Sequence, residues 1–202
     1  MNYLISHQNL AFPFLHTTAR KKTQKHQLIQ VRQGFAAVRL GKNEFIIQAG
    51  QILWLPFDCL TSLTYFPNSE ILELTISARS QKSYSYQAGL LNGSPILTTM
   101  LNELAKCPFD VENQEQKAWL NVVNFELEKL RPTLDNTLTL EQFIATSKSD
   151  RLGLNSALLV REAFKMRSSG AKPEKIIETL FSGQTEQAQQ LCLSIADKPL
   201  CK

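Results

Sequence analysis

Three histidines and four cysteines are the side chains of this sequence best suited to hold a metal ion or to transfer a proton. The cysteines are Cys59, Cys107, Cys192 and Cys201, and they form no CxxC pair or Cys/His cluster with zinc-finger spacing. His26 is adjacent to Gln27 and therefore lies on the opposite face of a strand, while His7 and His16 lie in the N-terminal segment. We therefore expect reduced thiols, surface or turn histidines, and no metal site.

The composition of the 202-residue chain, 43% hydrophobic and 20% charged, is typical of a globular protein. The formal charge is +4, and no segment is basic enough to establish nucleic-acid binding by charge alone. In the N-terminal stretch the charges follow the apolar part, which is the wrong order for a secretory signal. No apolar run approaches the roughly 20 residues of a membrane span. We expect a cytoplasmic protein with no membrane partner.

Residues 26 to 79 consist of short apolar runs separated by turn signals. The breaks lie at Gly34, residues 41–43, Gly50, residues 56–58 and residues 67–68. Strands at such close spacing predict an antiparallel sandwich or barrel. We expect this barrel to occupy residues 1–92.

After the barrel, from Ser94, the apolar residues recur at helical spacing. Ser94 as N-cap and Pro95 at the first helical position predict a helix, and a longer helix is expected over residues 113–130. These two helices form a pair over residues 93–132. Their apolar stripes contain Leu97, Leu101, Leu104, Trp119, Val123 and Leu127. Such stripes either cover the barrel or pair with a second copy of the chain, and we assign them to a homodimer interface.

A small helical domain is expected over residues 138–202. Thr139 and Gln142 form a capping box, Asp150 can cap the next helix, and Pro173 can open another. The sequence therefore predicts an α+β protein with an N-terminal antiparallel barrel and an α-helical C-terminal half.

The spacing of several barrel residues resembles the cupin superfamily. The second cupin motif runs Gly, five residues, Pro, one residue, Gly, two residues, His, three residues, Asn. Gly50 and Pro56 match this motif. The second Gly, the His and the Asn are replaced by Asp58, Thr61 and Tyr65. The resemblance implies a jelly-roll barrel.

The first cupin motif is also kept only in part. Gly34 matches its Gly, Gln27 stands where a Glu belongs, and its two His fall among residues 20–23, which contain none. Cupin enzymes hold Fe, Mn, Ni or Zn with neutral imidazoles and a carboxylate, and amide, hydroxyl and ammonium groups cannot replace these ligands. The resemblance therefore implies a metal-free cupin with no catalytic residues and no cofactor.

A barrel of this kind either binds a small ligand or is filled by its own side chains. If Thr61 points inward, then Leu63 and Tyr65 do so too, because side chains alternate along a strand. An apolar wall with a few polar groups suits a small molecule. We expect these ligand-binding residues in the barrel interior: Arg20, Gln27, Ile29, Thr61, Leu63, Tyr65, Leu72 and Leu74.

More narrowly, residues 20–80 resemble the sensing barrel of AraC-type regulators, in which two helices after the barrel pair the subunits. That family ends in two helix-turn-helix units, and TLEQFI and LLVREAFKMRSSGAKPEKI resemble parts of the first. The remaining chain is too short for two complete units, so this region looks shortened and degenerate. The resemblance implies DNA contacts by Arg161, Lys165 and Arg167; the alternative is a protein-contact module.

The sequence thus predicts a cupin-type ligand-sensing and dimerisation protein related to AraC-type transcriptional regulators, with weak or partner-dependent DNA binding. An alternative is a small epimerase-like or lyase-like cupin enzyme. Such an enzyme needs a general base, for which the sequence offers only Asp58 in a turn and His16. A third hypothesis is a degenerate regulator that acts by heterodimerisation with full-length relatives.

Overall fold

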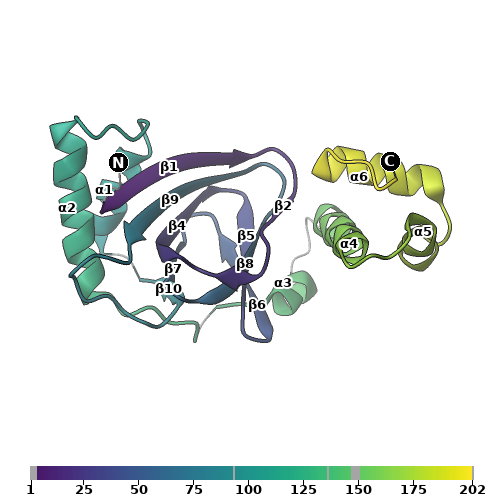
Figure 1. The fold of residues 1–202 in the computed structure, drawn as a ribbon, viewed down its shortest axis with the longest axis horizontal. Helices are drawn as coiled ribbons and strands as arrows, with labels where there is room; N and C mark the ends of the chain where they lie inside the picture. Colours follow the sequence, from purple (N-terminus) through teal and green to yellow (C-terminus); the bar gives the residue numbers. More distant parts are fainter. Residues whose placement is uncertain (1–3, 93, 136, 147–150, 202) are drawn as a thin grey trace.

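The computed structural model describes residues 4–92, 94–135, 137–146 and 151–201, and it contains an antiparallel barrel followed by helices (Figure 1). The first sheet has the order β1-β9-β4-β7-β10, and the second has the order β2-β8-β5-β6 with β3 also pairing to β8. Neighbouring strands in both sheets are antiparallel. The strands are β1 (Ile5–Phe12), β2 (His16–Thr17), β3 (Lys21–Lys22), β4 (Lys25–Gln33), β5 (Phe35–Leu40), β6 (Asn43–Gln48), β7 (Ile52–Leu55), β8 (Leu60–Tyr65), β9 (Ser69–Ser77) and β10 (Gly89–Leu91).

The helices follow the barrel in the sequence, so the predicted α+β class is confirmed. They are α1 (Pro95–Leu104), α2 (Gln114–Lys129), α3 (Leu140–Thr146), α4 (Arg151–Ser168), α5 (Pro173–Phe181) and α6 (Thr185–Ala196). Two predicted helix starts are confirmed by their hydrogen bonds. The Ser94 hydroxyl accepts from the Leu97 amide at 3.2 Å, and Thr139 and Gln142 bond reciprocally at 3.0 and 3.2 Å. The predicted cap at Asp150 lies outside the described residues.

Two apolar layers hold the barrel together. Between the two sheets, Ile29 and Leu53 of the first pack against Val38 and Leu63 of the second. On the outer face of the first sheet, α1 and α2 cover a second layer (Figure 1). The strands of the first sheet are therefore buried on both faces.

The predicted homodimer interface is wrong for most of its residues, because they form this second layer within one chain. Leu97, Leu101, Leu104, Val123 and Leu127 are at most 3% exposed and pack against Leu28, Trp54, Leu72 and Leu74 of the sheet. Trp119 is partly buried against the same cluster. A helix that covers a sheet and a helix that pairs with a copy carry the same apolar period, so the sequence pattern alone could not separate them.

The segment between α2 and α3 docks on an edge of each sheet. The amide and carbonyl of Thr133 bond to Leu90 on β10 at 3.0 and 2.9 Å, and the Leu138 carbonyl accepts from Ile46 on β6 at 3.0 Å. A Cβ on Gly89 would lie 2.7 Å from the Thr133 amide nitrogen, so the close approach needs a glycine there. This segment covers strand edges that would otherwise present unpaired backbone groups.

The C-terminal helices pack on the outer face of the second sheet. Leu140 of α3 with Leu154 and Ala157 of α4 contact Ala37 and Ile46 of the sheet. A separate apolar cluster joins α4, α5 and α6 to one another. In the part of the chain that the structure describes, none of the helices has the length and apolar character needed to cross a membrane.

A buried histidine lies where β1 meets α2. His7 Nε2 lies 3.3 Å from Gln116 Oε1, which also accepts from the Asp110 amide, so His7 Nε2 is the donor. His7 Nδ1 is buried and has no hydrogen-bond partner among the described residues. Burial lowers the pKa of His7, and the bond to Gln116 opposes this shift only in part. The sheet and α2 therefore pack around a neutral imidazole.

We predict that His7→Gln makes the protein less sensitive to acid. The pKa of His7 is near 6.5 in the unfolded chain and lower in the folded one, so its contribution to stability is complete above about pH 6.5 and is lost as the pH falls through the lowered pKa. Urea unfolding at about pH 7.5 and about pH 5 should give a smaller loss of unfolding free energy in His7→Gln than in the wild type. His16→Gln, at an exposed position, is the control, and equal losses in all three proteins would contradict the prediction.

Candidate ligand-binding site

The barrel interior contains five of the predicted ligand residues, packed closely together. Ile29, Leu63 and Tyr65 belong to the apolar cluster between the sheets, and Gln27 reaches into the same space. Thr61 alternates with Leu63 on β8 and is buried, and its hydroxyl has no hydrogen-bond partner among the described residues. The interior is therefore a packed core at these positions.

Glu73 is a buried carboxylate in this interior, and the sequence analysis missed it. Gln8 Nε2 donates to one of its oxygens at 2.5 Å, and Gln27 Nε2 donates to the other at 2.9 Å. Burial raises the pKa of Tyr65, and the nearby charge of Glu73 raises it further. The Tyr65 ring stacks on Phe12 with centroids 4.1 Å apart. Side chains of Gln8, Gln27, Glu73 and Tyr65 thus occupy this part of the interior.

The predicted inward positions of Leu72 and Leu74 are wrong. Both leucines pack against α1 and α2 on the outer face of the first sheet, whereas Ile71 and Glu73 face inward. β9 is buried on both faces, so apolar character does not identify its inner side. The hydrogen bond between Gln27 and Glu73 shows which face is inside.

A cavity of about 660 Å³ lies on the opposite face of the second sheet, between this sheet and α4. Its walls come from the N-terminal segment, the second sheet, α4, and the region at the end of α6. The lining residues are Leu15, Thr17, Thr18, Ala19, Arg20, Arg39, Glu44, Ser62, Thr64, Arg161, Glu162, Phe164, Lys165, Ser168, Ala196 and Lys198. The ligand site was predicted inside the barrel, but this cavity lies outside it.

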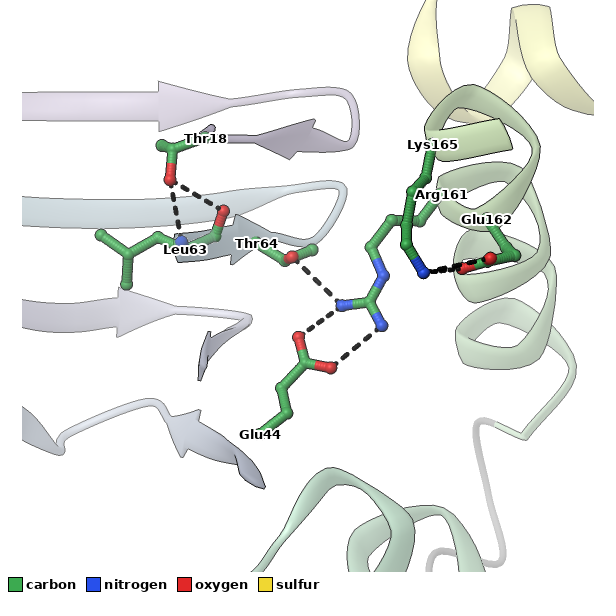
Figure 2. Close-up of polar contacts among 7 residues, drawn as sticks. All are labelled: Thr18, Glu44, Leu63, Thr64, Arg161, Glu162 and Lys165. Atoms are coloured by element: carbon green, nitrogen blue, oxygen red, sulfur yellow. Dashed lines mark hydrogen bonds and ion pairs between the residues drawn. The ribbon is translucent and has the colours of Figure 1, made fainter. Parts of the chain in front are cut away.

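The N-terminal segment is fixed along one side of the cavity by its hydrogen bonds to β8. Thr18 Oγ1 accepts from the Leu63 amide at 2.8 Å (Figure 2). The Thr18 amide donates to the Leu63 carbonyl at 2.9 Å. The Leu15 amide donates to the Ile195 carbonyl on α6 at 2.7 Å. The segment therefore connects the barrel to the last helix.

An ion pair crosses the cavity from α4 to the sheet. Arg161 extends from α4 toward β6 and β8, and its two terminal nitrogens donate to the two carboxylate oxygens of Glu44 at 2.5 and 3.0 Å (Figure 2). Nη1 also donates to Thr64 Oγ1 at 3.2 Å. Such paired arginine–carboxylate bonds fix geometry as well as adding energy. The Arg161 side chain therefore links α4 to the barrel.

The cavity combines positive charge with apolar surface. Its lining has five basic residues, at positions 20, 39, 161, 165 and 198, against the two acidic residues Glu44 and Glu162, which gives a formal charge of +3. Lys165 pairs with Glu162 at 3.0 Å. The Nε of Arg39 is buried without a hydrogen-bond partner among the described residues. Leu15, Ala19, Phe164 and Ala196 supply the apolar part of the lining.

Two further sequence predictions are corrected by this arrangement. Arg20 lies at the cavity, where it donates to the Gly41 carbonyl at 3.0 Å, and not in the barrel interior. Arg161 was predicted to contact DNA, but its guanidinium is held by Glu44 and Thr64 against the barrel. Lys165 lies at the same cavity beside Glu162, and DNA contact by Lys165 and Arg167 stays a prediction. The site consists of charged residues from distant positions in the sequence. They come together only when the chain folds, so no local sequence pattern identifies them.

The chemistry available at the cavity is binding of an anion. Arginine and lysine side chains are donors without acceptors, so they complement a carboxylate or phosphate group. Within the described residues, no group of three or more His, Cys, Asp or Glu is arranged to hold a metal ion.

We predict opposite effects from removing the hydroxyl groups of two threonines on β8. Thr61→Val should leave the unfolding free energy unchanged or raise it by up to about 1 kcal/mol, because the buried hydroxyl has no hydrogen-bond partner in the described part of the chain. Thr64→Val should lower it by about 1 kcal/mol, because Arg161 loses an acceptor. Urea titration of both variants measures the difference. Destabilisation by Thr61→Val equal to that by Thr64→Val would show that the Thr61 hydroxyl has a partner.

No protein-family model matches the sequence, and no curated protein matches it. Among solved structures, ToxT from Vibrio cholerae is 11% identical, with 98% of this chain and 96% of ToxT aligned at a TM-score of 0.44. A ToxT structure with a bound unsaturated fatty acid is 12% identical, with 98% and 92% aligned at a TM-score of 0.42. A cupin superfamily protein from Desulfitobacterium hafniense is 12% identical, with 38% of this chain and 71% of that protein aligned at a TM-score of 0.35. The two kinds of protein that the sequence motifs resemble, cupins and the AraC family to which ToxT belongs, are both among these structures.

Proposed function

We propose that this protein is a metal-free, cupin-type sensor that binds a small anionic molecule with an apolar body in the cavity between the second sheet and α4. The observation that carries the proposal is the cavity lining, which joins a formal charge of +3 to apolar side chains. The volume of about 660 Å³ falls within the range of small-molecule sites. Arg39 lines the cavity, and its guanidinium is one charged donor for such a ligand.

The helical module would report the bound ligand. One wall of the cavity belongs to the barrel and the other to α4, so a ligand that touches both favours one arrangement of the two parts. By analogy with AraC-type regulators, we propose that α4 passes this arrangement to DNA or to a protein partner. Lys165 and Arg167 remain the residues that we propose for DNA contact.

A small enzyme is the second candidate, and Glu73 is the observation in its favour. A buried carboxylate in the barrel interior could serve as the general base that the sequence analysis did not find. The Glu73 carboxylate is held by Gln8 and Gln27 within the packed interior, whereas the cavity of about 660 Å³ lies on the other face of the second sheet. We therefore favour the sensor.

We predict that dodecanoate, a carboxylate with an apolar chain, raises the melting temperature of the protein in a concentration-dependent way. A ligand that binds only the folded state stabilises it by mass action. Dodecanol, which has the same chain without the charge, and acetate, which has the charge without the chain, should each give a smaller shift at equal concentration.

Arg39→Gln should weaken dodecanoate binding about tenfold, because a charged donor is lost from the cavity wall. The matched control is Arg79→Gln, at an exposed position just after β9, which should bind dodecanoate as the wild type does. Equal shifts with dodecanol and dodecanoate would contradict the anionic class of ligand.

We further propose that the protein is a homodimer through the outer face of α2. Val122 and Phe125 on this face are 38% and 54% exposed. Lys129 in the last turn pairs with Glu126 at 2.8 Å and lies 4.0 Å from the centre of the Phe125 ring, and Glu115 lies in the first turn. A two-fold, antiparallel pairing of α2 with its copy would bring these ends of opposite charge together. The proposal replaces the buried residues of the predicted interface with exposed ones.

Phe125→Asp should convert this dimer to a monomer, because the pairing would bury a carboxylate opposite its own copy. Sedimentation velocity measures the change. Leu193→Asp on α6, where the leucine is 47% exposed, is the control and should leave the association state unchanged. Wild-type protein that is monomeric at a concentration of tens of micromolar, on the order of the dissociation constant of a transient dimer, would rule out the interface.

A further inference from the structure

We infer that Glu44 is a built-in competitor for the anionic ligand, and that the ligand binds by displacing Glu44 from Arg161. The inference rests on the proposed function, because it names how the same cavity is regulated. It assigns Glu44 a role in both affinity and signalling.

While Arg161 is bonded to Glu44, its two terminal nitrogens, Nη1 and Nη2, are not both free for a ligand. Nη1 is shared between Glu44 and Thr64, and Nη2 donates to Glu44 (Figure 2). A carboxylate binds a guanidinium most strongly through two parallel bonds. A ligand can therefore bind Nη1 and Nη2 end-on only after Glu44 has left; before that, only the side edge formed by Nε and the second hydrogen of Nη2 remains for it.

Glu44 also opposes an anion that would bind beside it. A ligand head group placed near Arg161 without displacing Glu44 would put two negative charges next to each other, at a site where both side chains of the pair are only 21% and 23% exposed. Partial burial reduces solvent screening of that repulsion. Exchange of one carboxylate for another avoids the repulsion and keeps the charge of Arg161 paired.

The position of Glu44 connects this exchange to the helical module. Glu44 precedes Phe45 and Ile46 on β6, and these two residues pair with the segment that leads into α3. Arg161 lies 117 positions later in the chain, on α4. Displacement of Glu44 therefore breaks the ion pair that links β6 to α4. Arg161 then pairs with the ligand instead.

The test compares two glutamates of the same cavity. Glu44→Gln removes the competitor and should raise the affinity for dodecanoate about fivefold. Glu162→Gln is the charge-matched control, because it removes the same formal charge from the lining but takes away the partner of Lys165 instead. Its gain should stay below about twofold, since the Lys165–Glu162 pair is more exposed and lysine does not offer two parallel donors. Isothermal titration calorimetry gives both affinities.

A double-mutant cycle separates competition from general charge. In Arg161→Gln there is no guanidinium for the two carboxylates to share, so adding Glu44→Gln should give no more than the gain seen with Glu162→Gln. If Glu44→Gln tightens binding equally with and without Arg161, or no more than Glu162→Gln in the intact protein, the inference is overturned.

The possible outcomes distinguish this inference from the proposed function. Binding to the wild type with equal gains in both glutamate variants overturns the competition and leaves the anion site standing. If dodecanoate binds to Glu44→Gln and not to the wild type, the competition is supported, because Glu44 then prevents binding in the wild type. No binding to the wild type or to any folded variant overturns the proposed site and the inference with it. Circular dichroism confirms that each variant is folded before titration.

Discussion

Burial of both faces of both sheets is the constraint on which the structure depends. The inner faces pack on each other, so each outer face needs a separate cover. The first sheet presents Leu28 and Leu74 outward, and the apolar stripes of α1 and α2 cover it closely. The second sheet presents Arg39, Glu44, Ser62 and Thr64 outward, together with apolar Ala37 and Ile46. Its cover by α3 and α4 is apolar at one end and polar at the other, and the cavity lies at the polar end.

The elements of this fold were predictable from sequence because their signals are local. Turn glycines and helix caps depend on a few adjacent residues, and Ser94 and Thr139 form the predicted bonds. The choice of face was not predictable on β9, because apolar residues there serve both the barrel interior and the helix contact. Leu72 and Leu74 were assigned inward for this reason, and the inward carboxylate of Glu73 was overlooked. The leucines of α1 were assigned to a dimer for a related reason, because an apolar stripe has the same period whether it packs on a sheet or on another copy of the chain.

Most of the candidate site could not be predicted: Arg20 was expected to bind a ligand, but in the barrel interior, and the other lining residues carry no recognisable pattern alone. Arg20 lies in a basic cluster that suggests a solvated turn, Glu44 lies on a strand, and Arg161 lies in a helix that resembles a DNA-binding unit. Only packing of α4 on the second sheet brings them to one cavity. From the cupin motif, Gln27, Thr61 and Tyr65 were expected to stand in place of metal ligands, and all three lie in the barrel interior. The motif said nothing of the outer face of the same strands, where Ser62 and Thr64 alternate with the motif residues.

The strength of the link between Glu44 and Arg161 limits how large a signal the cavity can send. Exposed ion pairs contribute up to about 1 kcal/mol and paired arginine–carboxylate bonds somewhat more, so exchanging this pair alters an equilibrium by about fivefold or a little more. The apolar contact of Leu154 and Ala157 with the sheet does not involve the anion and remains in place. The helical module would therefore shift on the barrel without leaving it. Coupling of this kind is reciprocal, so any partner that prefers the shifted module must raise the affinity of the cavity for its ligand by the same factor.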